Sequence, residues 1–414
     1  MLHYKKYDNG LRLVVNKMEG MLTVSCGVMV KTGSANEIAE NNGISHFIEH
    51  CMFKGTKKRS AFEISDHIDR IGGQINAYTA KEATCYYTKA TSEHLENTLE
   101  VLSDIFFNSV FDEKEIEKEK SVVIEEINMC EDSPEDVCLD LLAKSYYGDK
   151  GLGQTILGEA SNIKSFTREN LLEYIKKYYT PDNVVVSIAG NVDLKSAESL
   201  VFEYFANKFE VGGGCNKFVQ FTPKGSGNLI KFKDIEQAHV GLSLPTFSMF
   251  DEKTDSLSIA NIVFGGGMSS RLFQKIREEM GLCYNVYSFA SHYIDSGVLE
   301  IYGAVNVESR DKSVDAIISE INKFRKDGLT ENEFARGKQQ MKSSFIMGQE
   351  STVSQMLLQA RYLLYLNKKF NFNERIEQID KIKIDDVNEI ISKVFDVDKL
   401  SVATVGKNKN PIKI

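Results

Sequence analysis

The chain has 414 residues, of which 42% are hydrophobic and 26% charged, so it is long enough for two soluble domains of about 200 residues each. Five prolines and the lack of a Gly-X-Y period exclude collagen-like and proline-rich disordered chains. A net charge of −9 weighs against nucleic-acid binding, and no apolar run approaches the ~18 residues of a membrane span.

The first half alternates predicted strands and helices. β-forming residues and turn signals predict strands over 10–17, 21–33, 72–90 (as a hairpin) and 183–190. Apolar residues at helical spacing predict helices over 42–53, 61–71, 92–147, 167–178 and 195–209.

The second half repeats this order in outline. Strands are predicted over 239–245, 284–305 and 400–406, and a helix over 255–264. The glycine-rich segment 211–228 is the best linker candidate. We therefore expect an α+β fold with two homologous αβ domains and mixed sheets: 1–210, the linker 211–228, and 229–414.

The predicted helix over 42–53 carries the sequence HFIEH. His46 and His50 lie 40° apart on one helical face at about 100° per residue, while Ile44, Phe47, Ile48, Cys51 and Met52 lie on the opposite face. Two imidazoles at this spacing suit Zn²⁺, and Glu49 is placed to take a proton from zinc-bound water. The alternative is an amphipathic helix whose histidines are only hydrogen-bonded.

A third ligand is predicted on the helix that begins near Lys114. Its period places Ile116, Glu119, Val122, Val123, Glu126 and Cys130 on the buried stripe, with Glu125 about 100° away. A carboxylate on an apolar stripe is costly unless it is paired or bound to metal, so Glu126 is the better ligand of the two. Glu119 could orient a ligand from the second coordination sphere, or could be a solvated charge.

Three segments, NNGISHFIEHCMFKGT, GGQINAYTAKEATCYY and VVIEEINMCEDSPED, closely resemble the pitrilysin/insulinase family of zinc peptidases with an inverted motif. The resemblance extends to GGGMSSRLFQKIREEMGLCY in the second half, and the size resembles the processing-peptidase branch. In that family a distant glutamate completes the zinc site, and the spacing from His50 to Glu126 matches the family's spacing.

The resemblance implies a role for each matching residue. His46, His50 and Glu126 would bind zinc, Glu49 would be the general base, and Glu119 would match an additional acidic residue. Asn76 and Ala77 would lie on an edge strand that pairs with the substrate backbone. Arg277 and Tyr284 would contact substrate from the later domain.

The leading hypothesis is a zinc endopeptidase that cleaves peptides and unfolded segments in the chamber of a clamshell-type homodimer. One zinc per chain is expected, because alignment of the two halves sets Gly337 against Glu119 and Ser344 against Glu126. The alternatives are a catalytically inactive structural subunit of the same family and a metal-binding regulator.

The seven cysteines are odd in number and lack a CxxC pair, which is typical of a reduced, cytoplasmic protein. The N-terminus lacks the apolar stretch of a signal peptide, so we expect no secretory targeting. Cys51, directly after His50, is either a small buried residue or a thiol that makes the enzyme sensitive to oxidants.

Overall fold

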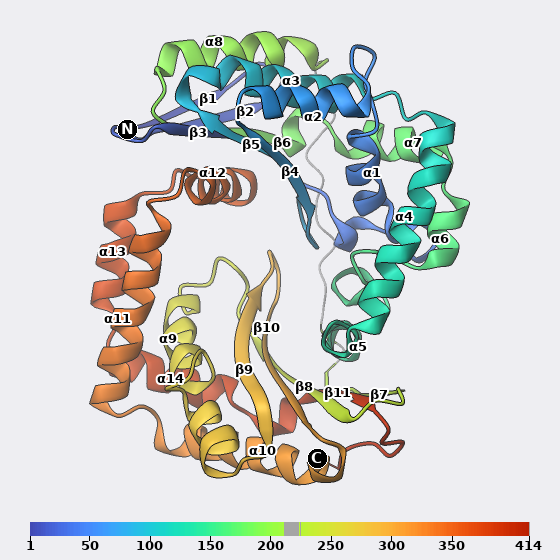
Figure 1. Cartoon of the computed structure of the whole chain (residues 1–414). Helices are drawn as coiled ribbons and strands as arrows, with labels where there is room; N and C mark the ends of the chain where they lie inside the picture. Colours follow the sequence, from blue (N-terminus) through green and yellow to red (C-terminus); the bar gives the residue numbers. More distant parts are fainter. Residues whose placement is uncertain (211–222, 224, 414) are drawn as a thin grey trace. The chain divides into compact units, whose positions relative to one another are not determined.

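The structure is a computed structural model that describes residues 1–210, 223 and 225–413 (Figure 1). Most of the expected linker 211–228 therefore lies outside the described residues. Within the described ranges, the strands are β1 (Leu2–Lys6), β2 (Arg12–Lys17), β3 (Thr23–Val30), β4 (Gln74–Thr79), β5 (Thr84–Thr91), β6 (Val184–Gly190), β7 (Asn228–Phe232), β8 (Gln237–Thr246), β9 (Cys283–His292), β10 (Gly297–Asn306) and β11 (Ser401–Gly406).

The α-helices of the same ranges are α1 (Ile44–Met52), α2 (Ala61–Arg70), α3 (Leu95–Asn108), α4 (Glu113–Asp132), α5 (Pro134–Tyr147), α6 (Ala160–Ser165), α7 (Arg168–Tyr178), α8 (Leu194–Tyr204), α9 (Thr254–Phe264), α10 (Arg310–Asp327), α11 (Glu331–Gly348), α12 (Thr352–Arg361), α13 (Phe372–Lys381) and α14 (Ile384–Val394). The described residues also include two π-helical segments, Phe273–Glu279 and Tyr362–Leu366. No helix in the described part of the chain is long and apolar enough to cross a membrane.

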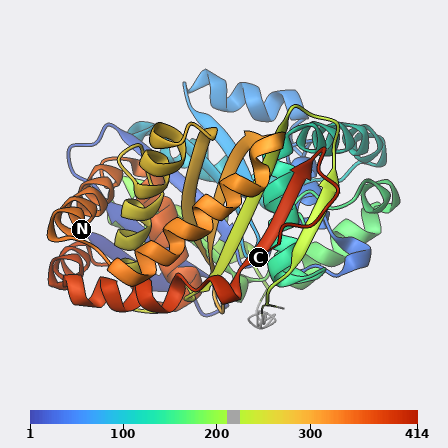
Figure 2. The same ribbon diagram turned by 90° about the horizontal axis from the view of Figure 1, so that it is seen from below.

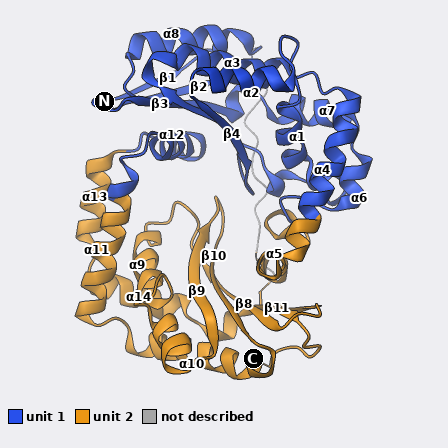
Figure 3. Ribbon diagram, in the orientation of Figure 1, with its two compact units in different colours: residues 1–127, 155–219, 346–370 blue, residues 128–154, 220–345, 371–414 orange. Residues whose placement is uncertain are grey.

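The chain divides into two compact units (Figure 3). Unit 1 contains 1–127, 155–219 and 346–370, and unit 2 contains 128–154, 220–345 and 371–414. Each unit therefore includes one segment from the other half of the sequence.

Unit 1 is built on a sheet with the order β1-β2-β6-β3-β5-β4 in the described residues. Strands β2 and β6 are parallel, and the other neighbours are antiparallel. Alternate strand residues such as Val28 and Val186 pack against α1, α3, α7 and α8 in the main core. The intervening residues, such as Met29 and Val185, pack on the other face against the segment that contains Ala360 and Leu363.

Unit 2 has the sheet order β7-β11-β8-β10-β9 within the described residues. Helices α9, α10 and α14 supply most of the helical side chains of its main core (Figure 2). On the other face of the sheet, Cys138 of α5 packs with Tyr302 and Val405 in a smaller cluster.

The two units repeat one topology. The order β2-β6-β3-β5-β4 corresponds strand by strand to β7-β11-β8-β10-β9, and β2/β6 and β11/β7 are the parallel pairs. Helices α4 and α11 begin at Glu113 and Glu331, and α5 and α12 begin at Pro134 and Thr352, so both pairs of equivalent helices are separated by the same length of chain. The expected α+β fold of two homologous units with mixed sheets is confirmed.

Candidate metal centre

Helix α1 is fixed at its first residues by a buried carboxylate. Gly43, with φ of 101°, turns the chain into the helix, and the N–H groups of Gly43 and Ser45 donate to Glu37 at 2.7 and 2.8 Å. A carboxylate at this end satisfies unpaired helix N–H groups and complements the helix dipole. Further along, Phe47 and Ile48 are buried in the core of unit 1, so the opposite face of α1 presents the histidines.

Three side chains of unit 1 converge at one point. His46 Nε2 lies 3.7 Å from Glu126 Oε2, and His50 Nε2 lies 3.4 Å from the same oxygen. Zinc bonds of ~2.0–2.1 Å at tetrahedral angles place two ligand atoms about 3.3 Å apart. The three residues are the one set of possible metal ligands found in the described part of the chain, with ligand atoms within 4.8 Å of one another.

The state of His46 suits metal binding. Burial, and then the neighbouring His50, lower the pKa of His46 to about 4, so the ring is neutral near pH 7. Its Nδ1 is buried and has no hydrogen-bond partner in the described structure, while Nε2 faces the other ligands. A neutral imidazole nitrogen is the form that binds zinc, so His46 fits the role of a zinc ligand.

Glu119 orients His50. Its Oε1 lies 2.9 Å from His50 Nδ1, and its Oε2 accepts from Lys54 Nζ at 2.7 Å. Glu119 is only 3% exposed, which excludes the interpretation as a solvated charge. Burial would raise the pKa of Glu119, but the bonds from His50 and Lys54 outweigh it, so the net pKa is lowered. The carboxylate fixes Nδ1 as a donor and leaves Nε2 for a metal.

Glu49 lies beside the three ligand residues. Its carboxylate accepts a hydrogen bond from the Thr79 hydroxyl of β4. Burial raises the pKa of Glu49, with a smaller contribution from the charge of Glu126, while Thr79 and His50 oppose the shift. A partly buried carboxylate with a raised pKa is suited to taking up and returning a proton.

Helix α4 agrees with the predicted phase at most positions. Ile116, Glu119 and Val123 are buried, Glu126 is half-buried toward the histidines, and Glu125 is exposed.

The prediction for Val122 is wrong, because this side chain is 50% exposed. Residues 116, 119 and 123 define the buried face of α4, and Val122 projects about 100° away from Val123.

The predicted substrate strand is at an edge. In the described sheet, β4 pairs with β5 alone, with Asn76 opposite Tyr87 and Ala77 opposite Tyr86. Asn76 is exposed, and its side-chain oxygen accepts from the backbone N–H of Ala77 at 2.8 Å.

Arg277 and Tyr284 lie together in unit 2. The guanidinium carbon of Arg277 is 5.0 Å from the centre of the Tyr284 ring, and Tyr284 is 77% exposed.

The second unit differs at the position equivalent to Glu119. A Cβ on Gly337 would lie 3.0 Å from Val263 and 3.2 Å from Ile259, both on α9. Close helix packing therefore replaces the carboxylate at this position.

Cys51 lies on α1 and is buried in the core of unit 1, with 2% of its surface exposed. Burial, and then the charge of Glu119, raise the pKa of its thiol to about 12. Both facts favour the interpretation of Cys51 as a packing residue.

Glu37, Lys54 and Thr79 support the centre but were not found by sequence reasoning. Lys54 had a signal, because it follows His50 by four residues, the spacing at which side chains of a helix share a face, although α1 itself ends at Met52. Glu37 and Thr79 had none, because a loop and a strand reach α1 only in the folded chain.

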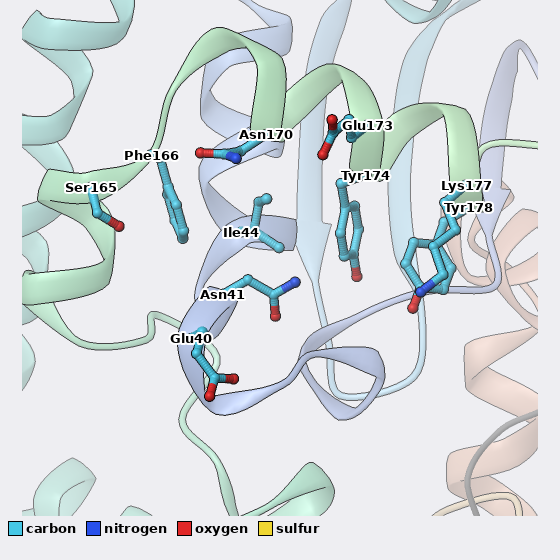
Figure 4. A pocket seen from close by; sticks show the side chains of 10 residues that line it. All are labelled: Glu40, Asn41, Ile44, Ser165, Phe166, Asn170, Glu173, Tyr174, Lys177 and Tyr178. Carbon is cyan, nitrogen blue, oxygen red and sulfur yellow. The ribbon is translucent and has the colours of Figure 1, made fainter.

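A groove of about 440 Å³ lies at the start of α1, and none of the three candidate metal ligands lines it (Figure 4). Ile44, Phe166, Tyr174 and Tyr178 line its apolar part, and Glu40, Glu173 and Lys177 are among its polar residues. It contains none of the predicted site residues.

Comparisons with known proteins identify the relatives of this chain. Residues 12–160 match the family model described as Insulinase (Peptidase family M16), and residues 165–341 match Peptidase M16 inactive domain. The Bacillus subtilis uncharacterized zinc protease YmxG is 42% identical over 95% of this chain and 96% of its own length. An uncharacterized zinc protease of Rickettsia felis is 36% identical over 94% of each chain.

Solved structures share the fold. A protease from Helicobacter pylori superposes with a TM-score of 0.91 at 23% identity, covering 98% of this chain and 99% of that one. A Pseudomonas fluorescens structure titled as a peptidase M16 inactive domain gives a TM-score of 0.91 at 18% identity over the whole of both chains. Together with the matched family models and the identity to named zinc proteases, this confirms the resemblance seen in the sequence: the chain belongs to the insulinase family, peptidase family M16.

Proposed function

We propose that this protein is a zinc-dependent endopeptidase that cleaves peptides and unfolded protein segments, with one zinc per chain. The observation that carries the proposal is the convergence of His46, His50 and Glu126 with Glu49 beside them. The names of the relatives support a zinc protease, and the edge strand supports extended substrates.

Each residue of the metal centre in unit 1 would have a separate role in peptide hydrolysis. Zinc, when bound, would polarise the scissile carbonyl and lower the pKa of a water molecule. Glu49 would take the proton of the attacking water and return it to the amine that leaves. Glu119, held by Lys54, would keep His50 in the orientation that a ligand needs.

Substrate specificity would depend largely on the backbone. A peptide added beside β4 would form main-chain hydrogen bonds at the edge that Asn76 and Ala77 occupy. Such pairing makes little demand on side chains, which favours unfolded segments over one defined sequence. Six described cysteines are free thiols, which supports a reducing compartment such as the cytoplasm.

The decisive experiment compares wild type with Glu49→Gln. Elemental analysis should find zinc in both proteins. Wild type should cleave a quenched fluorogenic peptide and the variant should not. The chelator 1,10-phenanthroline should abolish cleavage by wild type. Zinc without cleavage in wild type would favour the inactive structural subunit or a metal-binding regulator. Cleavage that survives in the variant would contradict the role of Glu49.

We also propose a homodimer in which Arg277 and Tyr284 of one chain serve the metal centre of the other. The proposal rests on the family resemblance and on the exposure of Tyr284 in unit 2. Glu49→Gln and Tyr284→Phe should each be poorly active. After subunit exchange, mixed dimers contain one intact site, so the mixture should recover roughly a quarter of wild-type activity. Activity that stays at the average of the parents would contradict sharing between chains.

A further inference from the structure

Strand β4 presents different side chains to its two faces. Ile75 and Ala77 pack toward the main core of unit 1, which includes α1, whereas Tyr78 packs in the cluster on the opposite face. Because strand side chains alternate, Thr79 lies on the same face as Ile75 and Ala77. The strand expected to bind substrate therefore directs a hydroxyl toward the metal helix.

The hydroxyl of Thr79 reaches the catalytic carboxylate. It donates a hydrogen bond to Oε2 of Glu49, across 30 residues of sequence and between β4 and α1. Among the described residues, Thr79 is the one hydrogen-bond donor to the Glu49 side chain. A glutamate has three rotatable side-chain bonds, so this hydrogen bond restricts the orientation of its carboxylate.

We propose that Thr79 is a positioning residue for Glu49, a role that rests on the proposed peptidase function. Its hydroxyl occupies Oε2 and holds the carboxylate in one orientation, so that Oε1 exchanges the proton with water and then with the leaving amine. A fixed proton acceptor lowers the cost of reaching the transition state, because the reacting groups no longer have to be ordered.

The same contact links substrate binding to the base. Thr79 lies two residues after Ala77 on the strand whose edge would pair with the peptide. An added peptide strand would immobilise β4, and with it the hydroxyl that holds Glu49. Extended substrates that pair along β4 would thus be cleaved faster than short ones that do not reach the strand.

Thr79→Val tests the proposal, because valine keeps the shape and strand preference of threonine and removes the hydroxyl. We expect kcat for a quenched peptide to fall by about 10- to 100-fold, with KM changed less than about twofold, since the lost contact acts in proton transfer. Thr79→Ser restores the hydroxyl and should recover most of kcat. Zinc affinity, measured by competition with a chromophoric chelator, should be unchanged in both variants.

The matched control is Thr91→Val on the neighbouring strand β5. Thr91 also donates to a glutamate, Glu93, at 3.4 Å, but this pair is exposed and lies outside the metal centre. The control should keep the kcat and KM of wild type. Crystal structures of zinc-free wild type and Thr79→Val give a readout independent of activity: the wild type should show the Thr79–Glu49 bond, and the variant a reoriented carboxylate.

Three results would overturn the proposal. These are an unchanged kcat in Thr79→Val, a serine variant as slow as the valine variant, or a rise in KM alone, which would place Thr79 in substrate pairing. Failure of the proposed function has a different signature, because wild type with bound zinc would then cleave no peptide, while the crystal structures would still report whether Thr79 orients Glu49.

Discussion

At the scale of residues, the centre depends on one buried carboxylate with two partners. Glu119 is almost wholly buried, and a buried charge is tolerated only when it is paired. His50 contacts one carboxylate oxygen of Glu119 and Lys54 contacts the other. Lys54 therefore compensates the negative charge of Glu119. It also fixes the orientation in which the carboxylate contacts His50.

Replacing Lys54 should therefore weaken metal binding without touching a ligand. We expect Lys54→Met to raise the Kd for zinc by up to about 10-fold, the lower end of the range for direct partners of metal ligands, because Lys54 acts through Glu119. Chelator competition measures the change. Lys58→Met is the control, because Lys58 is exposed and lies 3.4 Å from Glu100 in a surface pair. Equal affinities of the two variants would show that Lys54 does not support the centre.

Substitution of the two adjacent glutamates of α4 should have very different effects on zinc affinity. Glu126 faces both histidines, whereas Glu125 is exposed. Glu126→Gln should lower zinc affinity by several orders of magnitude, because a neutral amide replaces a charged ligand, and Glu125→Gln should change it less than about twofold. Zinc titration of both proteins checks this. Losses of similar size would mean that the helical phase places the wrong glutamate at the metal.

At the scale of elements, side-chain hydrogen bonds stabilise the first turn of helix α11. Helix α11 begins with a capping box in which Thr330 and Glu333 bond each other's backbone N–H groups. Arg271 adds two bonds to the same carboxylate, both at 2.8 Å. Burial would raise the pKa of Glu333, but these bonds outweigh it and lower the pKa to about 2.

This shift predicts a pH-dependent contribution to stability. The folded pKa lies below the unfolded value of 4.5, so Glu333 stabilises the protein fully above about pH 4.5 and loses its contribution as the pH falls toward 2. Glu333→Gln should reduce the free energy of unfolding by about 1–2 kcal/mol at pH 7, after allowance for solvent screening. In urea unfolding, this difference should fall to about three quarters of its pH 7 size at pH 4 and to less than about half at pH 3.

Glu331→Gln provides the control at the same helix end, because Glu331 is an exposed first-turn residue. Its effect should stay within a few tenths of a kcal/mol, as expected for an exposed charge near the helix dipole. A difference in unfolding free energy between wild type and Glu333→Gln that stays constant from pH 7 to pH 3 would argue against the ion pair as its cause.

At the scale of the whole molecule, the two homologous halves exchange one helix each. Helix α5, from the first half, packs on the sheet of unit 2, and α12, from the second half, packs on the sheet of unit 1. In unit 1, Thr352 bonds Ser25 at 2.9 Å, and Arg12 donates to the backbone oxygen of Leu363 at 2.8 Å. Each sheet therefore needs a helix encoded beyond its own half.

The exchange predicts that neither half folds alone. A fragment of residues 1–210 lacks the segment 346–370 and would expose the sheet face around Val14, Met29 and Val185. We expect it to aggregate or to bind the dye ANS, as proteins with exposed apolar surface do. Co-expression with a fragment of residues 229–414 should restore a soluble complex with zinc affinity. A stable, ANS-negative 1–210 fragment would contradict this dependence.

The sequence alone determined what is local or strictly periodic. The 3.6-residue helical repeat put His46 and His50 on one face of α1, opposite Phe47 and Ile48, and put Glu126 rather than Glu125 toward them. Alternation and turn residues located most strands, and the similar starts of α4 and α11 revealed the repeat. These features depend on residues within one element, or on the comparison of two similar elements.

Tertiary structure decided which distant residues meet. Val122 is exposed although a continuous stripe would bury it, because the neighbours of α4 cover only part of the helix. Glu37 and Thr79 reach α1 from a loop and an edge strand, and their side chains carry no periodic signal for that contact. The exchange of α5 and α12 between the halves could not be predicted from the sequence either. Each helix has an apolar face, and that face alone does not specify which sheet it packs against. The path of the folded chain decides this.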